Sequence, residues 1–175
     1  RLKVGKYTVK ITPYFFGVIY GEWLDWKRYY LPFDLSGATI LDVGAGCGET
    51  ALFYFLHGAR KVVCVEQDAH LSEIIHENIR SNGWNAEVLT REFGLDLLKI
   101  GFDFMKMDCE GCETELLGAP SIPPCVIEVH SDNLLTALKE RFDLSLGIGS
   151  VQYLIATSPR LGRDPGTGSH ERSRS

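Results

Sequence analysis

The segment Leu41–Thr50 constrains the fold of this chain more than any other part of the sequence. It carries three glycines at alternate positions, Gly44, Gly46 and Gly48, directly after a short apolar run that predicts a β-strand. Glycine lets the backbone turn sharply and approach a ligand without a Cβ atom in the way. The helical pattern that follows places free backbone N–H groups behind the loop. We therefore predict a strand, a ligand-binding turn and a helix, with a tight turn that binds nothing as the alternative.

The rest of the sequence alternates short apolar runs with helical patterns. Strands are predicted over residues 39–43, 61–66, 86–89, 102–107, 126–129 and 151–156. Helices are predicted over 50–56, after an Asp68 cap and after an Asp132 cap. This alternation favours an α/β domain with a Rossmann-like, doubly wound, mostly parallel sheet in a three-layer αβα arrangement. The short link over 91–101 requires either a minimal helix or an irregular crossover.

Composition divides the chain into three parts. Residues 1–36 are rich in aromatic side chains, and we expect an irregular N-terminal segment that packs on the core. Residues 37–157 carry the alternating pattern and are predicted to form the ligand-binding domain. Residues 158–175 are rich in Gly, Arg and Ser and offer little to bury, which predicts a disordered tail.

Charge and cysteine content limit the partners and the compartment. The formal net charge of −5 does not attract a polyanion, so a nucleic-acid partner is not favoured. No apolar run reaches the roughly 18 residues that span a bilayer, and we expect no membrane association. The five cysteines are an odd number and lie within or beside predicted strands. They favour reduced thiols in a cytoplasmic protein over a disulfide framework. The sequence leaves the oligomeric state open.

An acidic residue ends the second predicted strand. Glu66 lies 22 residues after Gly44, followed by Gln67, where a carboxylate can accept hydrogen bonds from both hydroxyls of a ribose. A surface turn carboxylate is the alternative. The dinucleotide fingerprint requires a glycine where this chain has Glu49, and a carboxylate there would repel a pyrophosphate. S-adenosylmethionine instead carries a cationic sulfonium and ammonium, so Glu49 and the nearby Asp42 favour it over NAD.

A second group of acids follows the fourth predicted strand, at the sheet edge that lines a ligand crevice. Asp108, Glu110 and Glu113 are suited to hold the cofactor ammonium, to orient a hydroxyl or to bind Mg²⁺ through oxygen, with a solvated turn as the alternative. Cys109 and Cys112 are predicted to be packing thiols, because no second cysteine pair with zinc-ligand spacing follows. No metal ligand is assigned from the sequence.

His130 ends the fifth predicted strand at the same edge, and it can share one face of that strand with Glu128. Histidine titrates near neutrality and is a candidate general base toward a hydroxyl, with a structural role as the alternative. The predicted catalytic residues are Asp108, Glu110 and His130. The predicted cofactor-binding residues are Asp42, Gly44, Ala45, Gly46, Gly48, Glu49, Glu66, Gln67 and Asp108.

Two segments resemble the class I S-adenosylmethionine-dependent methyltransferases and, within them, the FkbM-type family. Residues 42–50 are similar to the family's opening motif, and Lys106–Glu113 is similar to its Asp-x-Glu-Gly-x-Glu motif. The likeness covers about residues 20–157 and implies a seven-stranded Rossmann-like fold with methyl transfer to oxygen. It implies a small-molecule or glycan substrate.

Two other functions remain as alternatives. The first is an RNA methyltransferase core, which shares the cofactor half but normally carries an Asn-Pro-Pro-type motif that this sequence lacks. The second is a non-catalytic cofactor-binding or interaction module. Such a module is expected to keep the glycine loop and lose the acids, whereas this chain has both.

Overall fold

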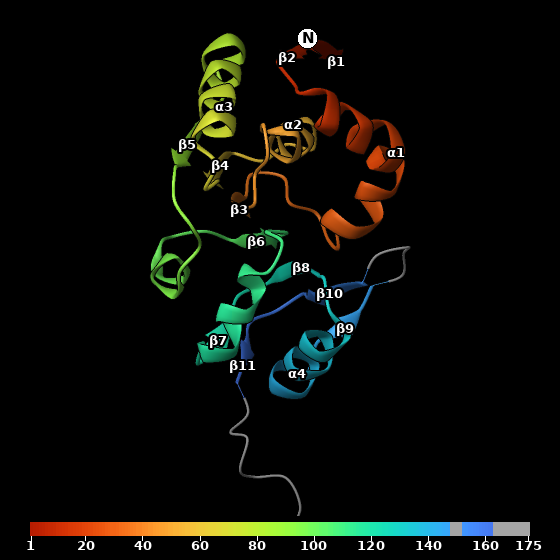
Figure 1. The fold of residues 1–175 in the computed structure, drawn as a ribbon, viewed down its shortest axis with the longest axis vertical. Helices are drawn as coiled ribbons and strands as arrows, with labels where there is room; N and C mark the ends of the chain where they lie inside the picture. The colour runs from red at the N-terminus through yellow and green to blue at the C-terminus, as the bar shows by residue number, and fades with distance from the viewer. Residues whose placement is uncertain (148–151, 163–175) are drawn as a thin grey trace, which may run out of the picture.

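The computed structural model describes residues 1–147 and 152–162, and within them a seven-stranded sheet forms the centre (Figure 1). The strands lie in the order β5 (Ala86–Leu89), β4 (Lys61–Val65), β3 (Thr39–Val43), β6 (Phe104–Met107), β8 (Cys125–Val129), β10 (Gln152–Ala156) and β9 (Ser145–Leu146). The first five are parallel, and β10 runs antiparallel to β8 and β9. The prediction of a mostly parallel sheet is confirmed. Val151, the first residue of the last predicted strand, lies outside the described residues.

Helices cover both faces of the sheet (Figure 1). They are α1 (Pro13–Tyr30), α2 (Glu49–Leu56), α3 (Ala69–Asn82), α4 (Asp132–Phe142) and two short 3₁₀ helices, η1 (Leu95–Lys99) and η2 (Cys112–Gly118). Side chains along β3 alternate between two apolar cores. Ile40 packs in the core formed with α1, α2 and α3, whereas Leu41 and Val43 pack in the core formed with η1, η2 and α4. The predicted three-layer αβα fold is confirmed.

The helix caps and the short crossover between β5 and β6 depend on the residues at those positions. Asp68 caps α3 as predicted, because its Oδ1 accepts two backbone N–H groups of the first turn. Ser131, not Asp132, caps α4: its Oγ accepts the N–H of Leu134, and Asp132 is already helical. Both residue types can cap, and the extended backbone at Ser131 decides between them. The expected minimal helix between β5 and β6 is η1.

The N-terminal segment is not irregular, and this prediction was wrong. β1 (Leu2–Val4) and β2 (Tyr7–Val9) form an antiparallel hairpin, and the 18-residue helix α1 follows it. Thr12 caps α1, and Pro13 occupies a first-turn position where its missing N–H does no harm. The buried residues of α1 are Ile19, Trp26, Tyr29 and Tyr30. Their spacing by three, four and seven residues is a helical signal that composition alone does not reveal.

Asparagine side chains of α3 hold the N-terminal hairpin against the domain. Asn82 Oδ1 accepts the N–H of Thr8 at 2.9 Å, and Asn78 Oδ1 accepts the N–H of Lys10 at 2.7 Å. The amide of Asn78 also donates to the carbonyl of Cys47 in the glycine loop. These bonds tie the start of α1 to the loop that it faces.

The chain just after β10 forms a further short strand. β11 (Arg160–Leu161) pairs antiparallel with β7 (Ser121–Ile122), and the N–H of Gly162 donates to the carbonyl of Pro120 at 2.8 Å. The predicted disorder from residue 158 is therefore wrong as far as residue 162, because backbone pairing holds a segment that has little to bury. Residues 163–175 lie outside the described residues.

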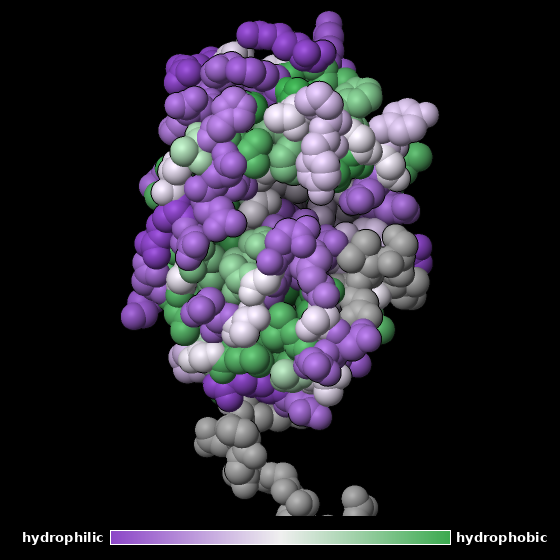
Figure 2. All heavy atoms as spheres, viewed as in Figure 1, coloured by the Kyte–Doolittle hydropathy of each residue, from purple (hydrophilic) through white to green (hydrophobic). Residues whose placement is uncertain are grey.

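Polar side chains cover most of the face drawn in Figure 2, with smaller apolar areas between them. On α1, the exposed side chains of Phe16, Tyr20 and Leu24 follow one another at four-residue spacing, so they share one stripe of the helix. Among the described residues, no helix combines the length and the apolar character that a bilayer crossing requires.

Candidate active site

A cavity of about 520 Å³ lies where β3, β4, β6 and β8 end, with α1 as its opposite wall. This edge of a parallel sheet is where α/β proteins bind ligands. Eight acidic and two basic residues line the cavity: Glu22, Glu49, Glu66, Glu92, Asp108, Glu110, Glu115 and Glu128, with Arg91 and Lys106. Both basic residues are paired with carboxylates, Arg91 with Asp96 and Lys106 with Asp42. The cavity therefore suits a cationic ligand.

The glycine loop forms one wall through its backbone. Gly44 has φ +71°, and a Cβ atom there would overlap the backbone carbonyl of Asp108 after β6. Gly46 has φ +57°, and a Cβ atom there would meet the carboxylate of Glu49 and the ring of Phe15. Glycine is required at both positions by the backbone conformation and by the space. The loop thus brings the ends of β3 and β6 together at the cavity.

Glu66 fastens the loop to the end of β4. Its Oε2 accepts the N–H of Gly46 and its Oε1 accepts the N–H of Asp68, each at 2.9 Å. Only 8% of Glu66 is exposed, so Glu66 is not the surface turn carboxylate that the sequence left as an alternative. The two backbone bonds draw the carboxylate inward while leaving it on the cavity wall. Gln67, the next residue, is exposed and also lines the cavity.

Glu49 lies at the first turn of α2 and faces the same cavity. Its Oε2 accepts the N–H of Cys47 at 2.9 Å. Burial raises the pKa of Glu49 to about 7, although backbone hydrogen bonding and the nearby Lys106 ammonium oppose the rise. A bound cation would favour the ionised form of this carboxyl.

Three of the residues that we assigned to cofactor binding lie behind the cavity wall. Asp42, Ala45 and Gly48 are buried and are not among its lining residues. Asp42 accepts a 2.6 Å hydrogen bond from the hydroxyl of Thr50 and pairs with the ammonium of Lys106 at 3.4 Å. Its carboxylate therefore supports the loop from behind.

Lys106 is a site residue that the sequence did not reveal. The side chain is 1% exposed, and its Nζ donates to the carbonyls of Gly44 at 2.8 Å and Val43 at 3.3 Å. Burial lowers the pKa of Lys106, but the carboxylates of Asp42 and Asp108 raise it more, so the lysine remains charged. A charged residue within an apolar strand pattern was the available signal, because such a residue is buried only with partners.

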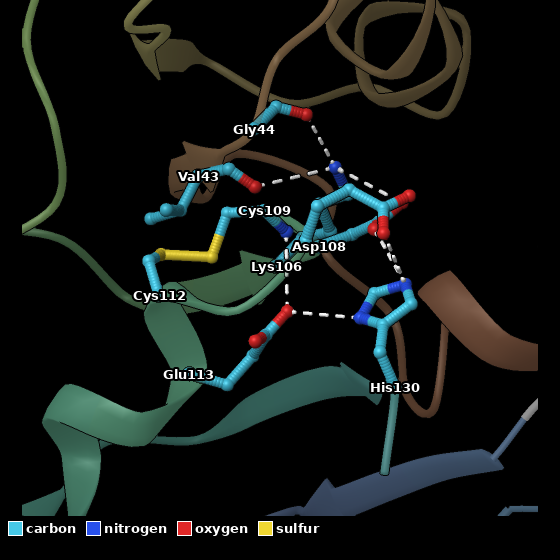
Figure 3. Close-up of a disulfide and its surroundings, with 9 residues drawn as sticks. Val43, Gly44, Lys106, Asp108, Cys109, Cys112, Glu113 and His130 are labelled. Carbon is cyan, nitrogen blue, oxygen red and sulfur yellow. Dashed lines mark hydrogen bonds and ion pairs between the residues drawn. A yellow bond between two sulfur atoms is a disulfide. The ribbon is translucent and has the colours of Figure 1, made fainter.

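His130 gathers the acids of the second half of the site (Figure 3). Its Nδ1 lies 3.2 Å from Glu113 Oε1. Its Nε2 lies 3.6 Å from Glu110 Oε2, 3.7 Å from Asp108 Oδ1 and 3.8 Å from Glu128 Oε1. Burial and the adjacent Asp108 carboxylate raise the pKa of Glu128 to about 7. The predicted catalytic residues Asp108, Glu110 and His130 thus lie together, and His130 lies beside the cavity while the other two line it.

Cys109 and Cys112 form a disulfide next to this cluster, so our prediction of packing thiols for this pair was wrong (Figure 3). The turn through Glu110 and Gly111, both with positive φ, brings the two Cα atoms to 5.6 Å. That separation is within the range that a disulfide spans. The other cysteines, Cys47, Cys64 and Cys125, are buried free thiols, as predicted.

Aromatic residues of α1 complete the cavity, and the sequence did not assign them to it. The helix contributes Tyr14, Phe15, Val18, Trp26 and Tyr30. Burial and the carboxylate of Asp108 raise the pKa of Tyr30 well above its ordinary value, so its hydroxyl stays protonated. Aromatic walls of this kind suit a flat ring such as a nucleobase.

No protein-family model matches the sequence. Uncharacterized protein 65 of Sulfolobus islandicus filamentous virus (isolate Iceland/Hveragerdi) is 29% identical over 118 residues, which are 62% of this chain and 68% of that protein. Uncharacterized protein 158B of Sulfolobus islandicus rod-shaped virus 1 is 30% identical over 104 residues, 54% of this chain and 60% of that protein. The ribosomal protein L11 methyltransferase of Sorangium cellulosum is 38% identical over 55 residues, 31% of this chain and 17% of that enzyme.

Solved structures extend the likeness to most of the chain. A methyltransferase from Pyrococcus furiosus superposes with a TM-score of 0.57 at 16% identity, covering 87% of each chain. The 16S rRNA N2 G1207 methyltransferase RsmC of T. Thermophilus, in complex with AdoMet and guanosine, superposes with a TM-score of 0.56 at 19% identity, covering 85% of this chain and 44% of that one. These likenesses show that the chain has the Rossmann-like fold of these two methyltransferases.

Proposed function

We propose that this chain is an S-adenosylmethionine-dependent methyltransferase and that the cavity at the glycine loop is its cofactor site. One observation supports the proposal above the others. The carboxylate of Glu66, the residue after β4, accepts the N–H of Gly46 in the loop after β3, and both residues line one cavity with Asp108. A ribose-binding acid, a close backbone approach and an acid for a cationic end are thus assembled in one place.

The lining chemistry fits this cofactor. Acids outnumber bases eight to two around the cavity, which favours a ligand with a sulfonium and an ammonium and opposes a pyrophosphate. A Cβ atom at Gly44 or Gly46 would collide with the backbone of Asp108 or the carboxylate of Glu49, so the two glycines let these acids lie close to the loop. We assign Glu66 and Gln67 to the ribose, the loop backbone and Glu49 to the middle of the cofactor, and Asp108 to its ammonium.

The bound cofactor supplies an activated methyl group and its own leaving group. The protein must therefore align an acceptor about 3 Å from the methyl carbon, exclude water and take up one proton. We assign proton uptake to the cluster of Asp108, Glu110 and His130, with His130 as the base that the sequence indicates. Glu113 holds the ring of His130 through Nδ1.

The proposed acceptor is a hydroxyl of a small molecule or a sugar, as the FkbM-type resemblance of Lys106–Glu113 implies. The excess of acids around the cavity supports a neutral acceptor, because it repels a phosphate backbone. RNA is the competing acceptor, because RsmC, which shares the fold, was solved with AdoMet and guanosine.

Calorimetry tests the cofactor assignment directly. We expect S-adenosylmethionine and S-adenosylhomocysteine to bind with micromolar affinity and NAD not to bind. Saturable NAD binding without adenosylmethionine binding would refute the proposal. Transfer of a labelled methyl group to polyol and sugar pools, compared with transfer to total RNA, then separates the acceptor classes. Binding without any transfer would leave the non-catalytic module as the function.

The variant His130→Asn tests the catalytic cluster. We expect it to abolish methyl transfer and to leave cofactor affinity unchanged, because it removes a proton acceptor and no cofactor contact. The matched control is His76→Asn, which alters an exposed histidine on α3. Full transfer activity in His130→Asn would show that the proton leaves by another route.

A further inference from the structure

The side chain of His130 makes a short contact at one ring nitrogen and only longer contacts at the other (Figure 3). Its Nδ1 lies at hydrogen-bond distance, 3.2 Å, from the buried carboxylate of Glu113. Its Nε2 faces carboxylate oxygens of Asp108 and Glu128 at 3.7 and 3.8 Å, both beyond hydrogen-bond distance. The contact with Glu113 fixes the orientation of the ring. A gap remains between His130 Nε2 and the carboxylate oxygens of Asp108 and Glu128.

The charges around this gap do not balance within the described residues. Four carboxylates, those of Asp108, Glu110, Glu113 and Glu128, lie within 4 Å of a single imidazole. Glu113 is 0% exposed, and its Oε2 has no hydrogen-bond partner among those residues. Lys106 reaches Asp108 only at 4.0 Å and is already paired with Asp42. Carboxylates this crowded are stabilised either by a proton that one of them holds or by a further cation nearby.

The gap has the dimensions of a divalent-cation site. One ligand atom each from Asp108, Glu128 and His130 lie within 4.8 Å of one another. An ion with bonds of about 2.1 Å in octahedral geometry separates neighbouring ligand atoms by about 3 Å and opposite ones by about 4.2 Å. The observed separations from Nε2, 3.7 and 3.8 Å, lie between these two values, so side-chain movements of less than about 1 Å would bring the three atoms to an ion. Two carboxylates with one imidazole form a donor set that accepts Mn²⁺.

Glu113 supplies an independent indication of a metal ion. A histidine that binds a metal through one nitrogen almost always donates the N–H of its other nitrogen to a carboxylate or carbonyl, which fixes the tautomer. Glu113 meets His130 Nδ1 in this way from a fully buried position on η2. A histidine that served only as an exposed surface residue would have no need of a buried partner.

We propose that Asp108, Glu128 and His130 bind one divalent cation of the Mn²⁺ and Mg²⁺ class, with Glu113 as a positioning residue. The site revises the sequence-based assignment of no metal ligand. The carboxylates of Asp108 and Glu128 also line the cavity, so the ion lies at the cavity wall. If the proposed function is correct, the ion would bind the oxygen of the methyl acceptor, an alcohol or a related oxygen compound, and lower its pKa. His130 would then act as a ligand of the ion, and the acceptor proton would pass to Glu110 of the same cluster instead of to His130.

Mn²⁺ binding to the full chain, measured by electron paramagnetic resonance after EDTA treatment and without cofactor, tests the site. We expect one saturable Mn²⁺ per chain. His130→Ala and Glu128→Gln are expected to lower the affinity at least tenfold. Glu113→Gln is expected to lower it by about 10- to 100-fold without loss of thermal stability, as for other partners of metal-bound histidines. His76→Ala and Glu73→Gln alter exposed residues of the same types on α3, away from the cavity, and serve as controls.

Two results would overturn the proposal: no saturable Mn²⁺ binding, or unchanged affinity in folded His130→Ala. Anomalous scattering from Mn²⁺ in crystals of the unaltered chain locates the ion even if a variant fails to fold, and an ion elsewhere contradicts the site. Cofactor binding measured in EDTA is a separate result. If the chain binds the cofactor in EDTA but binds no Mn²⁺, the metal site is refuted and the proposed function is not. If the chain binds Mn²⁺ but not the cofactor, the proposed function is refuted and the metal site is not.

Discussion

The two halves of the cavity stabilise their carboxylates in different ways. In the half formed by β3 and β4, Glu66 and Glu49 accept backbone N–H groups of the glycine loop and its neighbours. In the half formed by β6 and β8, Asp108 and Glu128 crowd around His130 at distances too long for hydrogen bonds. The carboxylates of the first half are therefore fixed by backbone hydrogen bonds, whereas those of the second half share the longer contacts of one imidazole.

If the proposed function is correct, this difference matches the two tasks of a transferase site. A cofactor is bound in the same way in every cycle, so rigid backbone contacts suit it. The acceptor side must bind an oxygen and remove its proton, so polar groups free to change partners suit it. Lys106 connects the halves, because its ammonium contacts Asp42 on β3 and lies 4.0 Å from Asp108 after β6.

The largest expected loss of stability comes from removing the ammonium of Lys106, which pairs with Asp42. Lys106→Met leaves Asp42 buried without its cation, and we expect the free energy of unfolding in urea to fall by about 3–5 kcal/mol. Lys61→Met is the control, because the Lys61–Glu87 pair is partly exposed and contributes about 1 kcal/mol or less. Equal losses in the two variants would show that Lys106 does not hold the halves together.

The contact between the glycine loop and the end of β6 is the next test. In Gly44→Ala the new Cβ atom overlaps the carbonyl of Asp108, and we expect a loss of about 3 kcal/mol from overpacking and backbone strain. In Gly37→Ala the φ angle is also positive, at +76°, but nothing lies within 4 Å, so the loss should be about 1 kcal/mol. Thermal unfolding measures the loss of stability in both variants. If the melting temperature falls equally in the two variants, the residue after β6 does not contact the loop closely.

Glu66→Ala tests the cofactor half by itself. We expect cofactor binding to weaken by about 1.5–3 kcal/mol, the range for hydrogen bonds to a charged group. The melting temperature should also fall, because the N–H groups of Gly46 and Asp68 lose their acceptor. Gln67→Ala, which alters an exposed neighbour on the same wall, should leave the melting temperature unchanged. Calorimetry with an unchanged affinity in Glu66→Ala would assign Glu66 a structural role alone.

The smallest effect concerns the titration of Glu49. Its pKa rises from an ordinary 4.5 to about 7 in the folded protein, mainly through burial. The unfolded chain therefore ionises first, and the folded state loses stability as the pH rises from 4.5 toward 7. Between about pH 5.5 and about pH 8 the loss should be about 2 kcal/mol.

Glu49→Gln removes this ionisation and keeps an oxygen that can accept the N–H of Cys47. We expect the free energy of unfolding in urea to depend less on pH in the variant than in the unaltered chain. The variant should be more stable than the unaltered chain at about pH 8 and nearly equal to it at about pH 5.5. A variant whose stability follows the same pH dependence as the unaltered chain would exclude Glu49 as the titrating group.

The sequence by itself determined the fold class and most of the cofactor half. The strand, glycine loop, helix and acid of residues 39–66 are a local pattern, and local geometry decides how such a pattern folds. The minimal crossover and the Asp68 cap were predictable for the same reason. The helix α1 was not predicted, because the aromatic-rich composition of the segment does not show that its buried aromatic residues repeat at helical spacing.

The tertiary structure alone decided the electrostatics of the site. Lys106 meets Asp42 from another strand, and Glu113 meets His130 from η2, so neither pairing has a signature in sequence spacing. Whether Cys109 bonds to Cys112 depends on the positive-φ turn between them, which the spacing does not specify. Burial and charge pairing depend on where distant segments meet in space, and a sequence pattern records only what is near along the chain.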